Sequence, residues 1–199
     1  MMIKVNENIS LLEIKKVLSK GSNFKIRTKD DFNKSLQHIM QLISDAYMLY
    51  INKSFSTSLF LAITVIEEIG KIHMGLFIDA STPPKSDPLR NHVSKQKIAS
   101  NYTISLGSRL HTAIGEKRVE ELLELAYAGK FMELRNSALY CDCKDDNFVI
   151  PADSISKTLS KEMLLFAIES FDDNLVGYTD YSMELSNQTD SIFAELSKD

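Results

Sequence analysis

The sequence is short of the residues that make turns, and this shortage limits the fold. Its 199 residues include 7 glycines and 4 prolines, together under half of the usual share of about 12%. A many-stranded sandwich or barrel needs such residues at its turns, so that architecture is excluded. The 44% of hydrophobic and 25% of charged residues are ordinary globular values, and a chain of this length can bury one proper core. We therefore expect one domain over residues 1–199, built from a few long helices.

The sequence also lacks a long hydrophobic run. The longest apolar run, residues 59–66, is interrupted by Thr64 and falls far short of the ~20 residues that a membrane span needs. The first ten residues contain no apolar segment followed by a small-residue cleavage site, so we expect no signal peptide. These absences predict a cytoplasmic protein without a membrane partner.

Cysteine is scarce, and its two copies lie together as Cys141 and Cys143. A secreted disulfide scaffold spaces its cysteines to close loops, which this pair cannot do. A structural zinc site takes about four ligands, and no second pair of cysteines completes one. We expect two reduced thiols without a metal or a cofactor, and the alternative is a redox or metal role. The sequence also shows no internal repeat and no glycine-rich phosphate loop.

Charge of one sign is scarce in whole stretches of the chain, although the net charge is only −4. Residues 15–34 carry a net +5 and residues 85–109 a net +4, whereas residues 162–199 carry −8. The two basic segments would form a phosphate-binding surface if the fold brings them together. The alternative is that they are ordinary solvated faces.

Apolar residues recur every three or four positions in several segments, which is typical of amphipathic helices. A helix capped by Thr28 is expected to run to about Asn52. The next, through residues 54–76, is apolar nearly all round in its first half, so it should be the central helix. Other helices are expected over residues 89–113 and 116–140 and from Pro151 past residue 175, with a loop at 81–88 and a turn at 142–152. The prediction is an all-α bundle of four to five long helices plus a short N-terminal helix.

A charged cluster, Glu67-Glu68-Ile69-Gly70-Lys71, interrupts the predicted central helix. Charges inside an apolar helix are costly unless they are paired or face a wet cleft. Glu67 precedes Lys71 by four residues, which is the favourable order for an ion pair on one helix face. Either this pair caps the wet end of the core, or the cluster lines a site.

Two more polar clusters are candidates for chemistry. Arg135 can hold a phosphate through two hydrogen bonds, and the nearby Asn136 and Tyr140 place polar groups on adjacent turns. His92 and Lys95, three residues apart, suit acid–base chemistry and phosphate binding. Each cluster alone is a weak signal, because a single histidine is more often structural or simply exposed.

The order of these motifs resembles the AbiV family of bacterial abortive-infection proteins, which carry a HEPN-type helical domain. The likeness covers residues 30–175. It consists of the helix from Leu61 to Lys71, then His92-x-x-Lys95, then Arg135-Asn136-x-x-x-Tyr140, and then Pro151 at the start of a last helix. Glu-Glu-x-Gly-Lys is its most specific part, although HEPN-like helices outside this family share it.

The resemblance implies a HEPN-like helical bundle, often a homodimer, and many HEPN domains are metal-independent endoribonucleases. Their signature is an arginine, a polar residue, a few spacers and a histidine. Arg135 and Asn136 match its first two positions, whereas Tyr140 stands where the histidine would be. A free tyrosine has a pKa near 10 and is a poor general base at neutral pH. His92 is therefore the alternative acid–base residue, if the fold brings it to Arg135.

From this resemblance we expect a phage-defence protein that acts on RNA, either as a metal-independent endoribonuclease toxin or as a non-catalytic module that binds RNA, a nucleotide or a protein partner. No cofactor is implied, and a phage or host protein is the candidate trigger. We expect a homodimer with the two Arg135 helices face to face, and Glu67 or Glu68 paired with Arg135 or Lys71. The expected catalytic residues are Arg135, Asn136, Tyr140 and His92, and the expected substrate-binding residues are Lys71, Lys95, Glu67 and Glu68.

Overall fold

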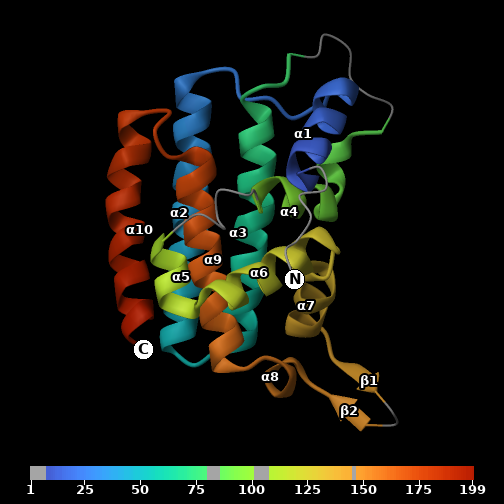
Figure 1. Cartoon of the computed structure of the whole chain (residues 1–199), viewed down its shortest axis with the longest axis vertical. Helices are drawn as coiled ribbons and strands as arrows, with labels where there is room; N and C mark the ends of the chain where they lie inside the picture. The colour runs from blue at the N-terminus through green and yellow to red at the C-terminus, as the bar shows by residue number, and fades with distance from the viewer. Residues whose placement is uncertain (1–7, 80–85, 101–107, 145–146) are drawn as a thin grey trace.

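In a computed structural model of the protein, the chain folds into a bundle dominated by helices (Figure 1). The structure describes residues 8–79, 86–100, 108–144 and 147–199. In chain order the elements are α1 (Ile9–Lys20), α2 (Lys29–Ile51), α3 (Phe55–Gly75), the 3-10 turn η1 (Pro88–Arg90), α4 (His92–Ala99), α5 (Ser108–Ile114), α6 (Glu116–Tyr127), α7 (Phe131–Leu139), β1 (Asp142–Lys144), β2 (Asn147–Val149), α8 (Pro151–Ser154), α9 (Lys157–Leu175) and α10 (Asp180–Lys198). The prediction of an all-α fold is confirmed.

Helix α3 is the central element of the bundle, as its apolar sequence predicted. It packs against α2, α9, α4 and α7, and Figure 1 shows it between α2 and the group formed by α4 and α7. Its buried side chains include Leu59, Ile63 and Ile66, none of which is exposed. A polar side chain on a buried face of α3, such as that of Glu67, therefore meets another helix rather than water.

Helices α2, α9 and α10 begin at side-chain caps that the sequence contains. At α2 the Thr28 hydroxyl accepts from the backbone N–H of Asp31, and the Asp31 carboxylate accepts from the backbone N–H of Thr28. Ser156 caps α9 and Thr179 caps α10 in the same way, through the side-chain oxygen. Each cap satisfies N–H groups that the helix itself leaves without an acceptor.

Two of the predicted helices are divided in the structure. The helix expected over residues 116–140 is two helices, α6 and α7, because Gly129 adopts a left-handed conformation (φ 75°) between them. Within the described residues, the helix expected over 89–113 consists of η1, α4 and α5. Residues 101–107, and most of the loop expected over 81–88, lie outside the described residues.

The end of the chain also differs from the prediction. Pro151 opens only the four-residue α8, and the long α9 begins at Lys157, after the Ser156 cap. Helix α9 ends at Leu175, and Gly177 (φ 96°) makes the turn to a separate α10. The turn expected at residues 142–152 contains an antiparallel hairpin of β1 and β2, which projects from the bundle (Figure 1). Its first strand holds Cys143, which is free and exposed.

Within the described residues, no helix combines the length and the hydrophobicity needed to cross a membrane.

Candidate functional site

The carboxylate of Glu67 is the centre of a polar cluster inside the bundle. Glu67 lies on α3 and is 3% exposed. Its Oε2 is 2.6 Å from Nδ1 of His92, and its Oε1 accepts a hydrogen bond of 2.8 Å from Nε2 of Gln96. Both partners come from α4, which packs directly on α3.

Two cations lie at longer distances from the same carboxylate. Nζ of Lys95, on α4, is 3.8 Å from Oε2, and Nε of Arg135, on α7, is 3.9 Å from Oε1. Glu67 therefore faces two positive side chains besides His92. Its single negative charge can neutralise only one of these two side chains. The excess of positive charge in a partly buried place favours binding of an anion.

Gly70 explains how α4 comes close enough to place these partners. A Cβ at Gly70 would lie 2.1 Å from the carbonyl oxygen of Lys95, so a side chain at this position has no room. Gly70 follows Glu67 by three residues and shares its face of α3. The Glu-Glu-x-Gly-Lys motif thus combines a buried carboxylate with the gap into which α4 fits. No pattern in the sequence assigns this function to Gly70 or any function to Gln96.

Arg135 is held in the cluster without a strong hydrogen bond. Its guanidinium lies over the ring of Phe60, 4.7 Å from the ring centroid. Its Nε is buried and has no hydrogen-bond partner among the described residues. The Arg135 side chain is 21% exposed, so its donors remain open to a ligand that reaches the cluster.

His92 connects the buried carboxylate to the surface. The contact of Nδ1 with Oε2 of Glu67 fixes the ring and directs Nε2 away from the carboxylate. The His92 side chain is 43% exposed. This carboxylate–histidine arrangement leaves one ring nitrogen available to take or give a proton. His92 and Arg135 thus meet at the same carboxylate, as the acid–base hypothesis for His92 requires.

Glu68 and Lys71 form a separate pair on α3. Nζ of Lys71 is 2.9 Å from Oε2 of Glu68 and lies 4.7 Å from the centroid of the Phe24 ring. Of the two alternatives for this cluster, the Glu67–Lys71 ion pair is not the one observed, because Glu67 turns toward α4 and Lys71 pairs with Glu68 instead. The wider expectation, that Glu67 or Glu68 pairs with Arg135 or Lys71, is confirmed.

Asn136 and Tyr140 lie on the exposed side of α7 and at its C-terminal end. Tyr140 is 60% exposed. Within the part of the chain that the structure describes, no hydrogen bond or ion pair joins either side chain to the Glu67 cluster. Their roles in a reaction stay predictions.

A helical bundle whose central helix gathers a carboxylate, a histidine and two cations defines a candidate site for a phosphate-bearing ligand. The family model of AbiV, a HEPN family, matches residues 29–171. Since the match spans well over half of the chain, the protein belongs to the AbiV family. The matched region contains every residue of the Glu67 cluster, whereas α1 and α10 lie outside it. No curated protein and no solved structure gives a significant match.

Proposed function

We propose that the protein acts on RNA in phage defence, as a metal-independent endoribonuclease whose active site is the Glu67 cluster. The observation that carries this proposal is the excess of positive charge around one buried carboxylate, next to a histidine with a free ring nitrogen. A phosphodiester supplies the missing negative charge, and the histidine supplies the proton transfer. We take residues 1–199 as one cytoplasmic HEPN-like domain and a phage or host protein as its trigger.

In the proposed reaction, Nε2 of His92 removes the proton of a ribose 2′-hydroxyl. The 2′ oxygen attacks the adjacent phosphorus, and the bond from phosphorus to the 5′ oxygen of the next nucleotide breaks. The leaving 5′ oxygen takes up a proton from Tyr140 or from water. The products are a 2′,3′-cyclic phosphate and a free 5′-hydroxyl, so the reaction uses no cofactor.

The other residues hold and stabilise the phosphate. Arg135 offers donors to the phosphate oxygens on which charge develops, and Lys95 adds its positive field from the buried side. Asn136, one residue further along α7, would orient the phosphate. Glu67 is a positioning residue for His92, while Glu68 and Lys71 support this part of α3 through their own ion pair.

The proposed active form is a homodimer with the two α7 helices face to face, which would double the positive charge at one cleft. Apolar side chains that suit such an interface are exposed where α7 ends and in the hairpin after it, at Leu139, Tyr140, Phe148 and Ile150. Phe148 is 70% exposed. Light scattering at micromolar concentration should give the mass of two chains, and a monomeric mass would count against the dimer.

A second candidate function is a binding module that holds RNA, a nucleotide or a protein partner without cleaving RNA. The observation in its favour is the position of Tyr140, which replaces the signature histidine and is not bonded to the cluster within the described residues. In this case Arg135 and Lys95 bind the phosphate, and His92 only completes the hydrogen bonds of Glu67.

Incubation of the purified protein with end-labelled RNA in excess chelator tests the proposal. We expect cleavage by the parent and neither cleavage nor tight binding by Arg135→Ala. Binding without cleavage by the parent, over a set of structured and unstructured RNAs, would establish the binding module instead. Cleavage that stops when the chelator is added would contradict metal independence.

A further inference from the structure

Helix α1, outside the region matched by the family model, packs against the part of the fold that supplies His92. It contacts α4 and η1. The Ser94 hydroxyl on α4 donates to Glu13 on α1 over 2.6 Å. Val17 of α1 is buried in one apolar cluster with Leu89 and Ile98. The two basic segments of the sequence therefore converge, because the first includes the second half of α1 and the second includes η1 and α4.

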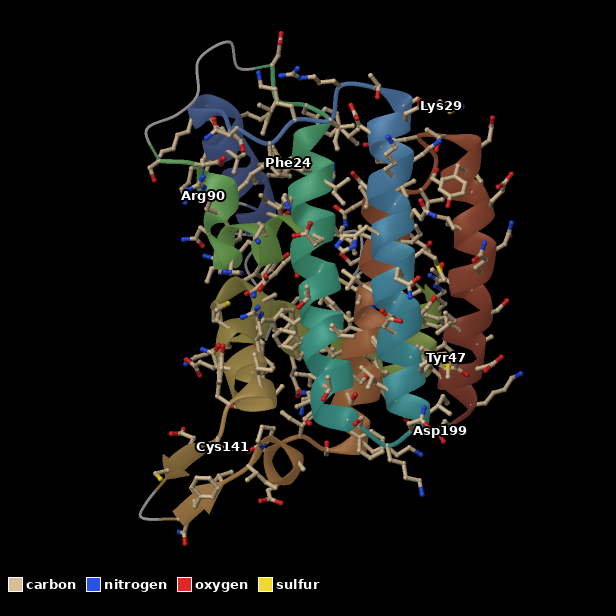
Figure 2. All side chains as sticks on the ribbon, turned by 180° about the vertical axis from the view of Figure 1, so that it is seen from behind. Phe24, Lys29, Tyr47, Arg90, Cys141 and Asp199 are labelled. Carbon is tan, nitrogen blue, oxygen red and sulfur yellow. The ribbon has the colours of Figure 1, made fainter. Side chains whose placement is uncertain are left out.

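Charge is segregated to opposite sides of the molecule. Residues 8–27 and 86–100, which form the α1, η1 and α4 side, carry eight lysines and arginines against two acids. Residues 157–199, which form α9 and α10, carry nine acids against three lysines. Figure 1 shows α1 and α4 on one side of the bundle and α10 on the other, and Figure 2 shows Arg90 on the basic side. A net charge of −4 thus conceals a strongly basic face.

Lysines of both helices meet around Glu13, the acid that α1 contributes. Nζ of Lys16 is 2.7 Å from its carboxylate. Burial alone would raise the pKa of Glu13, but hydrogen bonds from Lys16 and Ser94 and the charge of Lys97 lower it below its ordinary value. Lys97 of α4 therefore lies close to α1. The positive charges of Lys16 and Lys97 together exceed the negative charge of Glu13. The exposed Lys20 adds a further positive charge one turn beyond Lys16.

Helix α4 contributes residues to both the basic face and the Glu67 cluster. Lys97 and His92 are five residues apart on α4, which is about 7.5 Å along the helix axis. A neighbouring nucleotide of the same strand spans such a distance. Arg90 precedes His92 by two residues and is exposed. A strand held at His92 and Arg135 thus has basic side chains along its path on the α1 side.

We propose that RNA bound at the Glu67 cluster runs across the α1–α4 face, defined by Lys16, Lys20, Arg90 and Lys97, and that this face holds the backbone phosphates flanking the reacting one. The inference rests on the proposed function for its ligand and adds where that ligand lies. An anionic membrane is the competing partner for such a face. Surface-bound helices turn one continuous apolar side to the lipid, whereas the exposed leucines of α1 are divided between two flanks. Leu11 and Leu18 lie away from Lys16 and Lys20, and Leu12 lies on the same flank as these lysines.

The test uses RNA carrying 2′-O-methyl groups, which binds without being cleaved. The variant Lys16→Gln/Lys20→Gln/Lys97→Gln removes three phosphate contacts, and each contact to a single strand contributes about 0.7 to the salt slope. We expect the slope of log affinity against log salt to fall by about 2, and binding at 0.1 M salt to weaken by roughly 100-fold. The matched control, Lys53→Gln/Lys117→Gln/Lys198→Gln, has the same charge change on other surfaces and should bind as the parent does.

The outcomes separate this inference from the proposed function. If the parent binds RNA tightly and both triple variants bind it equally well, the proposed RNA path is wrong. The proposed function of the Glu67 site would not be affected by that result. Failure of the parent to bind or cleave any RNA would remove the proposed function and this inference together.

Vesicles of phosphatidylserine and phosphatidylcholine are the third arm of the experiment. Parent binding to them that the Lys16/Lys20/Lys97 variant loses, with RNA binding unchanged, would assign the face to a membrane. Thermal unfolding of both variants within a few degrees of the parent verifies that they fold.

Discussion

At the scale of single residues, Glu67 supplies the negative charge that compensates Lys95, which is buried beside it. The side chain of Lys95 is 9% exposed, and its ion pair is with Glu67. A buried ammonium group that loses its counter-charge is left uncompensated in a poorly solvated place. The stability of this region therefore depends on an anion at the position of the Glu67 carboxylate.

We expect Glu67→Gln to lower the free energy of unfolding by about 3 kcal/mol, measured by urea denaturation at pH 7. The control Glu68→Gln breaks a more exposed pair and should cost less than about 1 kcal/mol. Sulfate should restore more stability to Glu67→Gln than it adds to the parent, because it replaces the missing negative charge. Equal losses in the two variants, or no response to sulfate, would contradict the account.

The contrast between His92 and Tyr140 decides which side chain moves the proton. His92→Ala should lower the RNA cleavage rate by about 100-fold or more, the usual effect of losing a general base, while RNA binding is nearly kept. Tyr140→Phe, which removes only a hydroxyl from an exposed ring, should lower it by much less. The reverse order of the two effects would make Tyr140 the acid–base residue and His92 a structural one.

The sequence predicted candidate site residues where the chemistry of a residue did not match the pattern around it. A carboxylate in an apolar helix drew attention to Glu67, and the motif order added His92, Lys95 and Arg135. Gln96 is neutral, and its importance appears only when its amide is seen to bond Glu67. The turn of Glu67 toward α4 was not predictable, since helical spacing allows Lys71 as a partner equally well.

At the scale of elements, the contact of α3 with α4 positions the site, and Gly70 permits it. Gly70→Ala should force α4 away from α3 and cost about 1–3 kcal/mol of stability, as overfilling of a packed contact does. It should also weaken RNA binding, since Lys95 and His92 would move from Glu67. The comparison is Thr57→Ala on an exposed position of the same helix, which should leave both the melting temperature and RNA binding unchanged. A stable Gly70→Ala that binds RNA normally would show that close contact is not required.

A second contact between elements, distant from the site, fixes the C-terminal helix. Arg109 on α5 pairs with Glu169 and Asp172 of α9 and with Asp190 of α10, and it lies over the Phe193 ring. Burial and the charge of Asp190 raise the pKa of Asp172 to about 6, although Arg109 acts in the opposite direction. Three carboxylates around one guanidinium leave negative charge in excess.

This cluster predicts a stability that depends on pH. A free aspartate has a pKa of about 3.9, so the folded protein binds more protons than the unfolded chain between about pH 4 and 6. The contribution of Asp172 is therefore present at low pH and is lost as the pH rises, by up to about 2 kcal/mol. Urea unfolding from pH 4.5 to 7 should show a smaller decline for Asp172→Asn than for the parent. Asp45→Asn, at an exposed position on α2, should keep the parent's profile.

The sequence predicted the type of each long element better than it predicted where each helix begins and ends. The periodic apolar residues indicated the long helices, but two start signals, Pro151 and Ser156, lie close together, and only packing selects the second for α9. Gly129 and Gly177 divide helices through their left-handed backbone, which the apolar spacing around them does not reveal.

At the scale of the whole molecule, the segregation of charge matters more than the net charge. The sequence showed two basic segments without showing that they meet, because the packing of α1 on α4 depends on buried contacts such as that of Val17. Once they meet, the basic face and the Glu67 cluster share helix α4, and α10 with its acidic residues lies on the other side of the bundle (Figure 1). An approaching polyanion is steered to the side that carries His92.

The most direct test of the account is the cleavage chemistry itself. The parent is incubated in chelator with an RNA and with the same RNA carrying 2′-deoxyribose at the mapped cleavage position, and the product ends are identified by mass spectrometry. We expect cleavage of the first substrate to a 2′,3′-cyclic phosphate and a 5′-hydroxyl, no cleavage of the second at that position, and loss of the reaction in Arg135→Ala. Cleavage that tolerates the 2′-deoxy sugar, or that persists in Arg135→Ala, would contradict a reaction at the Glu67 cluster.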